Sequence, residues 1–209
     1  MDFKDNYRKI GCFDVSSIRH HLAQLNESDW MKHNRRQQQH KAHVNTHMIP
    51  LLYDDDYRFS NPTKHAYYST LDYEITLLLD LVSRVYDNKG YPLRLLLTRL
   101  LPNAEILPHT DKGPSLRWVH RIHIPIQTNA LVTFKIGGEI LSLKEGELWE
   151  INNCHVHNVK NASRMFRIHL ILDWVTPSLV RAYLQEKFNR KLIEKTVTHK
   201  PVISDDYYR

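Results

Sequence analysis

Residues 131–143 read LVTFKIGGEILSL, and this stretch predicts a β-hairpin. Two runs of apolar and β-branched residues flank Gly137-Gly138, and paired glycines readily adopt the positive φ angles of a two-residue hairpin turn. Short apolar runs at Ile122–Ile126 and Leu148–Ile151 predict further strands on either side. Short strands separated by turns are typical of an all-β sandwich or barrel. Among these folds we expect a jelly roll, whose narrow mouth can hold one small cofactor.

Longer apolar runs predict additional strands. Leu93–Leu101 is nearly continuous in apolar residues, as in a strand of a sheet interior, and Met165–Val175 follows the turn Asn161-Ala162-Ser163. Thr46–Tyr53 indicates a strand that Pro50 interrupts at a sheet edge, because proline has no N–H to donate to a neighbouring strand.

Helical patterns precede these strands. Apolar residues three and four apart predict amphipathic helices over Val15–Leu25 and Leu71–Tyr86, and Ser69 or Thr70 can cap the second. Asn26–Trp30 indicates a loop or a helix end.

The C-terminal part predicts one more helix. Thr176 can cap it, Pro177 suits its first position, and an apolar face runs from Leu179 to Phe188. The tail from Lys191 to Arg209 is polar, and either lies along the surface or serves in dimerisation. We expect one integrated domain in which residues 1–90 pack on a barrel formed by residues 91–175, followed by the helix and tail of residues 176–209.

Composition narrows the class of protein. The 209 residues carry a formal net charge of +6, which permits an acidic substrate or incidental polyanion binding. Cys12 and Cys154 form neither a disulfide framework nor a zinc spacing, so we expect a reducing, cytoplasmic setting. No signal peptide and no apolar run of about 18 residues occur, so no membrane span is expected.

The basic segment Arg35–Lys41 is either a solvated loop or a loop that faces the substrate or binds a polyanion. Because the sequence contains no nucleic-acid-binding motif, we expect no specific nucleic-acid binding.

A candidate metal site lies between the predicted strands. His109 and Asp111 are two residues apart in an extended segment, so both side chains can point to one side. His157, on a later predicted strand, can supply a third ligand, although His155 is a rival. Two histidines and one carboxylate on one face of an octahedron are the site of non-haem Fe(II) oxygenases, which leave three positions for co-substrate and dioxygen.

Arg167 is the candidate partner for such a co-substrate. A 2-oxo acid can supply the electrons that dioxygen chemistry requires, and its far carboxylate would need a fixed cation inside a barrel. A guanidinium suits this task because its planar fork grips a carboxylate through two hydrogen bonds. Taken alone, Arg167 could equally form a surface salt bridge. Thr98 lies on the strand before His109 and is a further candidate for this site.

These residues belong to a longer series of motifs. The series is PHTD at residues 108–111, RIHIPIQTN at 121–129, GELWEINN at 146–153, HNVKN at 157–161 and RIHLILD at 167–173, preceded by RLLPNAEI at 99–106. In this order the motifs resemble the aspartyl/asparaginyl β-hydroxylase family of Fe(II)- and 2-oxoglutarate-dependent oxygenases, across roughly Leu93–Trp174.

The resemblance implies a mainly β fold with flanking helices, a double-stranded β-helix of the cupin-like jelly-roll type. It implies an enzyme that hydroxylates an unactivated carbon with Fe(II), 2-oxoglutarate and dioxygen. His109, Asp111 and His157 would bind the iron, and the His-x-Val-x-Asn pattern favours His157 over His155.

The resemblance also implies roles around the co-substrate. Arg167 would hold the distal carboxylate of 2-oxoglutarate, and the Thr98 hydroxyl would assist Arg167. Arg121 and His123 would lie near the end of the co-substrate that chelates iron.

The substrate is less specified. Arg117 and His120 lie in the loop after Asp111 and suit an anionic substrate, so we expect a small molecule or a peptide, such as an amino acid or an aspartyl or asparaginyl side chain. The alternative for these two residues is that they serve only the co-substrate. The alternative function is a non-redox metal-binding cupin-like protein or sensor, and the sequence leaves the oligomeric state and any role of Cys154 open.

Overall fold

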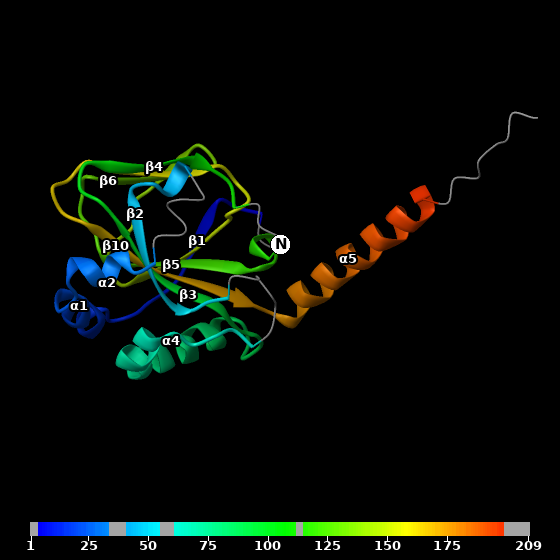
Figure 1. The fold of residues 1–209 in the computed structure, drawn as a ribbon, viewed down its shortest axis with the longest axis horizontal. Coiled ribbons are helices and arrows are strands. Elements are labelled where there is room, and N and C mark those ends of the chain that lie inside the picture. The colour runs from blue at the N-terminus through cyan, green and yellow to red at the C-terminus, as the bar shows by residue number, and fades with distance from the viewer. Residues whose placement is uncertain (1–3, 34–40, 55–60, 112–114, 199–209) are drawn as a thin grey trace, which may run out of the picture.

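Two sheets face each other in the computed structural model, which describes residues 4–33, 41–54, 61–111 and 115–198, with side chains as far as Lys191 (Figure 1). The strands are β1 (Tyr7–Cys12), β2 (Thr46–Leu52), β3 (Tyr91–Leu100), β4 (Ala104–His109), β5 (His120–Gln127), β6 (Val132–Ile136), β7 (Glu139–Leu141), β8 (Glu147–Ile151), β9 (His157–Asn161) and β10 (Arg167–Val175). The helices are α1 (Ser16–Ala23), α2 (Glu27–Met31), α4 (Asp72–Val85) and α5 (Pro177–Thr198), with the 3₁₀ helices η1 (Lys41–His43), η2 (Ala66–Leu71) and η3 (Leu116–Trp118).

The strand order confirms the predicted jelly roll. The larger sheet has the order β1-β8-β5-β10-β3-β2, and the smaller sheet has the order β4-β9-β6-β7. All pairings between the described strands are antiparallel. The chain passes repeatedly from one sheet to the other, so residues distant in sequence line the space between the sheets.

Alternation along the central strands separates a packing face from an inner face. Ile122, Ile124, Leu170 and Leu172 belong to a core that includes residues of α1 and α4, which cover the outer side of the larger sheet (Figure 1). The intervening residues of β5 and β10 face the smaller sheet. All nine residues of β10 are buried because both faces of this strand are covered.

The predicted hairpin is β6–β7, and it closes one end of the smaller sheet. Gly137 and Gly138 have φ angles of 56° and 88°, the positive values that a tight turn between these strands requires. Phe134 pairs across the hairpin with Leu141 and is 2% exposed. Its ring belongs to a second core cluster that lies between the two sheets and includes Ile106 and Val159.

The N-terminal region contributes strands as well as helices. β2 lies at one edge of the larger sheet, as Pro50 predicted, and its register with β3 shifts between Pro50 and Leu52. β1, which the sequence pattern did not reveal, forms the opposite edge through its pairing with β8. Arg35–Lys41 falls outside the described residues except for Lys41.

The predictions about helix ends had different outcomes. Of the two alternatives for Asn26–Trp30, a loop or a helix end, the loop was wrong, because Asn26 begins α2 with a capping box in which its side chain accepts from the Asp29 N–H and Asp29 accepts from the Asn26 N–H. Neither Ser69 nor Thr70 caps α4, because η2 runs directly into the helix and Leu71 occupies the capping position without a side-chain hydrogen bond.

The C-terminal helix begins at Pro177, as predicted, and projects from the barrel (Figure 1). Leu179 is buried, but Leu184 and Phe188 are 55% and 63% exposed, so only the first turn of the expected apolar face packs on the barrel. Helix α5 continues through the first eight residues of the predicted tail, to Thr198. Among the described helices, none has the length and apolar character to cross a membrane.

Candidate metal centre

A cavity lies between the two sheets. Its volume, including the space at its open mouth, is about 450 Å³. It is lined by His43, Thr46, Thr98, Ile106, His109, Asp111, Arg121, His123, Phe134, His157, Val159, Arg167 and Ile171. Most of the sequence-predicted site residues therefore lie in one place, although β3, β4, β5, β9 and β10 supply them separately.

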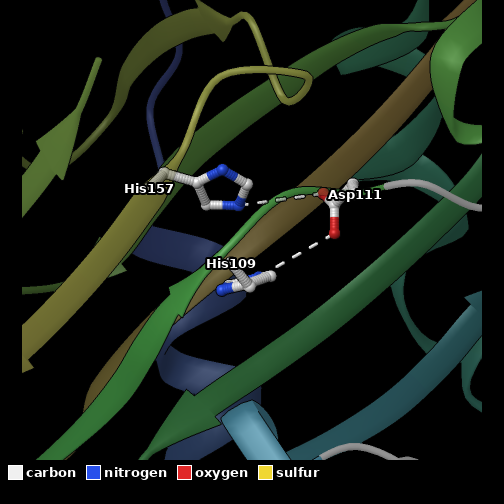
Figure 2. A group of neighbouring side chains, drawn as sticks. All are labelled: His109, Asp111 and His157. Atoms are coloured by element: carbon white, nitrogen blue, oxygen red, sulfur yellow. Dashed lines mark ion pairs between the residues drawn. The ribbon is translucent and has the colours of Figure 1, made fainter.

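The structure brings His109, Asp111 and His157 together at this cavity (Figure 2). One ligand atom from each residue lies within 4.8 Å of the other two. Nε2 of His109 lies 3.8 Å from Oδ1 of Asp111, and Nε2 of His157 lies 3.9 Å from Oδ2. His109 ends β4 directly opposite His157 at the start of β9, which explains how residues far apart in sequence meet.

Backbone contacts orient both imidazoles. Nδ1 of His109 donates to the Leu107 carbonyl at 2.8 Å, and Nδ1 of His157 donates to the His155 carbonyl at 2.9 Å. With the proton on Nδ1, each ring presents its Nε2 lone pair towards Asp111, the tautomer that a metal ligand requires. Burial lowers the pKa of His157, which favours this neutral form.

His155 is turned away from the cavity. Its Nδ1 lies 2.7 Å from Oδ1 of Asn6, at the turn that precedes β9. Of the two candidates for the third ligand, the positions of their side chains therefore favour His157 over His155.

Arg121 joins Asp111 to a second buried carboxylate, Asp173. Its Nη1 donates to Oδ2 of Asp111, while Nε and Nη2 donate to the two Asp173 oxygens at 2.8 and 2.9 Å. Arg94 donates to Asp173 at 2.5 Å and to the Ser115 hydroxyl at 2.9 Å. Burial alone would lower the pKa of Arg121, but the two carboxylates outweigh burial and raise it. Arg121 lines the cavity, and its ion pair holds Asp111 in place.

Arg167 is buried, and no carboxylate of the described residues pairs with it. Its side chain is 2% exposed, and its Nη2 donates to Nδ1 of His169 at 2.8 Å. Nε of Arg167 has no hydrogen-bond partner among the described residues. Burial lowers the pKa of Arg167 to about 9, so the guanidinium stays charged at neutral pH, and the described part of the chain offers it no counter-ion.

His123 and Thr98 also line the cavity, next to Arg167. Nδ1 of His123 has no hydrogen-bond partner among the described residues, and burial, followed by the charges of Arg167 and Arg121, lowers its pKa well below the ordinary value. The Thr98 hydroxyl donates to the backbone carbonyl of His169 at 3.3 Å. Thr98 therefore contacts the residue that accepts a hydrogen bond from Arg167, and its predicted assistance to Arg167 stays a prediction.

His120 and Arg117 are not among the residues that line the cavity. His120 has the strand parity of Ile122, so it faces the outer helices, where Nδ1 donates to Glu150 at 2.7 Å and its ring packs on Tyr86. Arg117 lies in η3 and pairs with Glu186 of α5 at 3.8 Å. Neither side chain lines this cavity, so their expected role in binding a substrate stays a prediction.

Two polar residues of the cavity lining, His43 and Thr46, were missed because they come from the N-terminal region. His43 packs its ring at 83° to that of His109, with 4.7 Å between ring centroids. The Thr46 hydroxyl donates to the His43 carbonyl at 2.8 Å and fixes this turn. No local pattern marks either residue, because only the pairing of β2 with β3 brings this segment to the cavity.

The donor set fits a divalent metal with open positions. Two imidazoles and one carboxylate form the combination found at non-haem Fe(II) sites, and the three ligand atoms lie within 4.8 Å of one another. The buried, uncompensated Arg167 fits an anionic co-substrate in the same cavity.

Comparisons with known proteins agree with this geometry. The match to L-proline cis-3-hydroxylase 1 from Streptomyces sp is 26% identical over 117 residues, covering 54% of this chain and 38% of that protein, so well under half the relative's length is matched. An oxidoreductase of the 2OG-Fe(II) oxygenase family from Burkholderia pseudomallei superposes with a TM-score of 0.58 at 13% identity, over 81% of this chain and 84% of that chain. A prolyl-4-hydroxylase from Pseudomonas putida gives a TM-score of 0.51 at 11% identity, over 82% and 92%.

The two structural matches support the fold alone, because their sequence identities are low. The family model described as aspartyl/asparaginyl beta-hydroxylase covers far more than half of the chain, matching residues 13–177. Its span begins before α1 and ends at the first residue of α5, so it contains the whole cavity. The chain therefore belongs to the aspartyl/asparaginyl beta-hydroxylase family.

Proposed function

We propose that this protein is an Fe(II)- and 2-oxoglutarate-dependent hydroxylase. The observation that carries the proposal is the meeting of His109, Asp111 and His157 in one cavity with Arg167, a buried cation that pairs with no carboxylate in the described ranges of the chain. A metal site alone would not require that cation. Membership of the hydroxylase family supports the same activity.

In this proposal the three ligands hold Fe(II) on one face. Bound Fe(II) would supply a reaction in which dioxygen oxidises an unactivated C–H bond of the substrate to an alcohol. In the same reaction 2-oxoglutarate is converted to succinate and carbon dioxide. Arg121 would orient Asp111 as a ligand through its buried ion pair. The carbonyls that bind Nδ1 of His109 and His157 keep both rings in the ligating tautomer.

The remaining walls serve the co-substrate and exclude water. Arg167 would bind the distal carboxylate of 2-oxoglutarate. His123 lines the same cavity, and its Nδ1 has no partner in the part of the chain that the structure describes. Ile106, Val159 and Ile171 line the same cavity and keep it apolar between the polar groups. Such surroundings strengthen the interaction between Arg167 and a carboxylate, because less water screens the charges.

The substrate we propose is an amino acid or an aspartyl or asparaginyl side chain. Support comes from the family and from the proline hydroxylase relative. Arg121 is engaged by two carboxylates, and Arg117 pairs with Glu186 outside the cavity, so neither is available as the main anchor for a substrate carboxylate. His43 and Thr46, beside His109, are the lining residues from the N-terminal region that can contact a substrate.

An anaerobic titration tests the site. Fe(II) and then 2-oxoglutarate are added to the wild type, Asp111→Ala and Arg167→Ala, and the visible charge-transfer band of the iron-bound 2-oxo acid is recorded. We expect the band in the wild type and its loss or weakening in both variants. Asp80→Ala and Arg84→Ala, which remove one exposed ion pair on α4, are matched controls that should retain it.

The outcome separates the two candidate functions. Metal binding without the band in the wild type would contradict the proposal and favour a non-redox metal-binding protein. If the band appears, succinate release with free L-proline, other amino acids and aspartyl or asparaginyl peptides identifies the substrate class, and a product heavier by one oxygen atom confirms hydroxylation.

A further inference from the structure

Buried arginines in this protein differ in the charge of their partners. Among the described residues the buried arginines are Arg94, Arg99, Arg121 and Arg167. The first three pair with carboxylates, those of Asp173, Glu27 or Asp111. Arg167 instead donates to the imidazole of His169. Since an uncompensated buried cation is costly, a neutral partner at this one position calls for a physical explanation.

The hydrogen bond defines the state of His169. A guanidinium only donates, so Nδ1 of His169 accepts at 2.8 Å and carries no proton. The ring is therefore neutral, with its proton on Nε2, an atom that has no hydrogen-bond partner among the described residues. Burial, followed by the charge of Arg167, lowers the pKa of His169 well below the ordinary value, which agrees with a neutral ring.

The position of His169 is fixed from two sides. Its side chain is fully buried, and its ring lies edge-on to that of His123 at 72°, with 5.8 Å between centroids. Its backbone carbonyl accepts from the Thr98 hydroxyl on β3. Arg167 and His169 are two residues apart on β10, so they point to the same side of the sheet and Nδ1 stays within reach of the guanidinium.

We propose that His169 is a positioning and specificity residue for the 2-oxo acid: it orients the Arg167 guanidinium by accepting a hydrogen bond while leaving its positive charge free for the distal carboxylate. This inference rests on the proposed function. A carboxylate at residue 169 would pair with Arg167 internally and compete with the co-substrate. An aliphatic side chain would leave Nη2 without its acceptor and the guanidinium less well oriented.

The test measures binding of two 2-oxo acids to the full-length, Mn(II)-loaded protein by calorimetry without oxygen. The ligands are 2-oxoglutarate and 2-oxopentanoate, which has the same carbon chain but no distal carboxylate. The proteins are the wild type, His169→Asn, His169→Leu and His169→Asp. Asparagine retains a neutral acceptor, leucine removes the acceptor, and aspartate adds a charge. Mn(II) affinity and circular dichroism of each variant verify the fold.

We expect the wild type and His169→Asn to prefer 2-oxoglutarate to a similar degree. His169→Leu should weaken 2-oxoglutarate roughly 10-fold and His169→Asp roughly 10- to 100-fold, with 2-oxopentanoate little changed in both. If His169→Asp does not fold, the contrast between leucine and asparagine decides the question.

Unchanged preference in both the leucine and aspartate variants would overturn the role of His169 while leaving the proposed function intact. Equal losses for both 2-oxo acids would also overturn it, since they would indicate a merely structural role. If the wild type binds neither 2-oxo acid, the proposed function fails and this inference fails with it.

Discussion

Replacing Asp173 by asparagine probes the buried charge network beside the metal centre. Asp173 is fully buried and accepts hydrogen bonds from Nε of Arg94 and from Nε and Nη2 of Arg121. Asparagine keeps the shape of the side chain but removes its charge, so two guanidiniums lose their shared counter-ion. Removing one partner of a buried ion pair costs roughly 3–5 kcal/mol, and we expect Asp173→Asn to lower the free energy of unfolding by this amount.

Urea unfolding at pH 7, followed by tryptophan fluorescence, measures this loss. Asp80→Asn is the matched control, because Asp80 and Arg84 form an exposed pair whose side chains are 55% and 69% accessible. Such a pair contributes at most about 0.5 kcal/mol. A loss for Asp173→Asn no larger than that of Asp80→Asn would refute the reasoning, since the network would then contribute no more than a surface contact.

The pH dependence of Asp173→Asn supplies a second readout. Burial alone would raise the pKa of Asp173, but Arg121 and Arg94 outweigh burial and lower it. A carboxyl whose pKa is lowered in the folded state makes its full contribution to the free energy of unfolding above its unfolded pKa of about 3.9. This contribution is lost as the pH falls through the pKa of the folded state. The difference between wild type and variant should therefore be largest near neutral pH and shrink below about pH 4.

Three further predictions concern other parts of the chain. Burial alone would raise the pKa of Glu147, but hydrogen bonds from Lys9 and Trp149 outweigh burial and lower it to about 2. Glu147→Gln should therefore lower the free energy of unfolding at pH 7, and progressively less below about pH 4.5. Urea unfolding at pH 7 and at low pH measures this change. Asn26→Ala should cost about 1 kcal/mol of unfolding free energy through loss of the α2 capping box, and an unchanged urea midpoint would contradict it. The metal-free protein should keep its far-UV circular dichroism, because backbone carbonyls already orient the His109 and His157 rings. Mn(II) at 100 times its dissociation constant should raise the free energy of unfolding of the wild type by about 2.7 kcal/mol, and that of His157→Ala by much less.

The sequence predicted those elements whose pattern is local. The hairpin at Gly137-Gly138 and the buried strand β3 follow from turn chemistry and from apolar runs, and both were confirmed. The capping box of α2 was also present in the sequence, because Asn26 and Asp29 have the required spacing, yet the segment was interpreted only as a loop or a helix end and not as a separate helix. β1 was missed because it is a partly exposed edge strand with little apolar alternation.

The candidate site was predicted unevenly for a similar reason. His109 and Asp111 could be grouped because two residues of an extended segment share a side. Neighbouring residues of a strand point to opposite faces of the sheet, so His120 and Arg121 of β5 lie on opposite faces. The outward position of His120 could therefore have been predicted from the sequence. The ion pair of Arg117 with Glu186 and the approach of His43 to His109 depend on tertiary packing, which no local pattern encodes.

The carbonyl contacts of His109 and His157 have a consequence for mutational tolerance. Each ring is held by the main chain two residues before it, at Leu107 and at His155, so the side chains of those residues contribute nothing to that hold. Leu107 is 43% exposed and free to vary, and the His155 ring can be replaced while its carbonyl still orients His157. Libraries that diversify these two residues should therefore retain metal affinity, because the two carbonyls that orient the ligand rings remain.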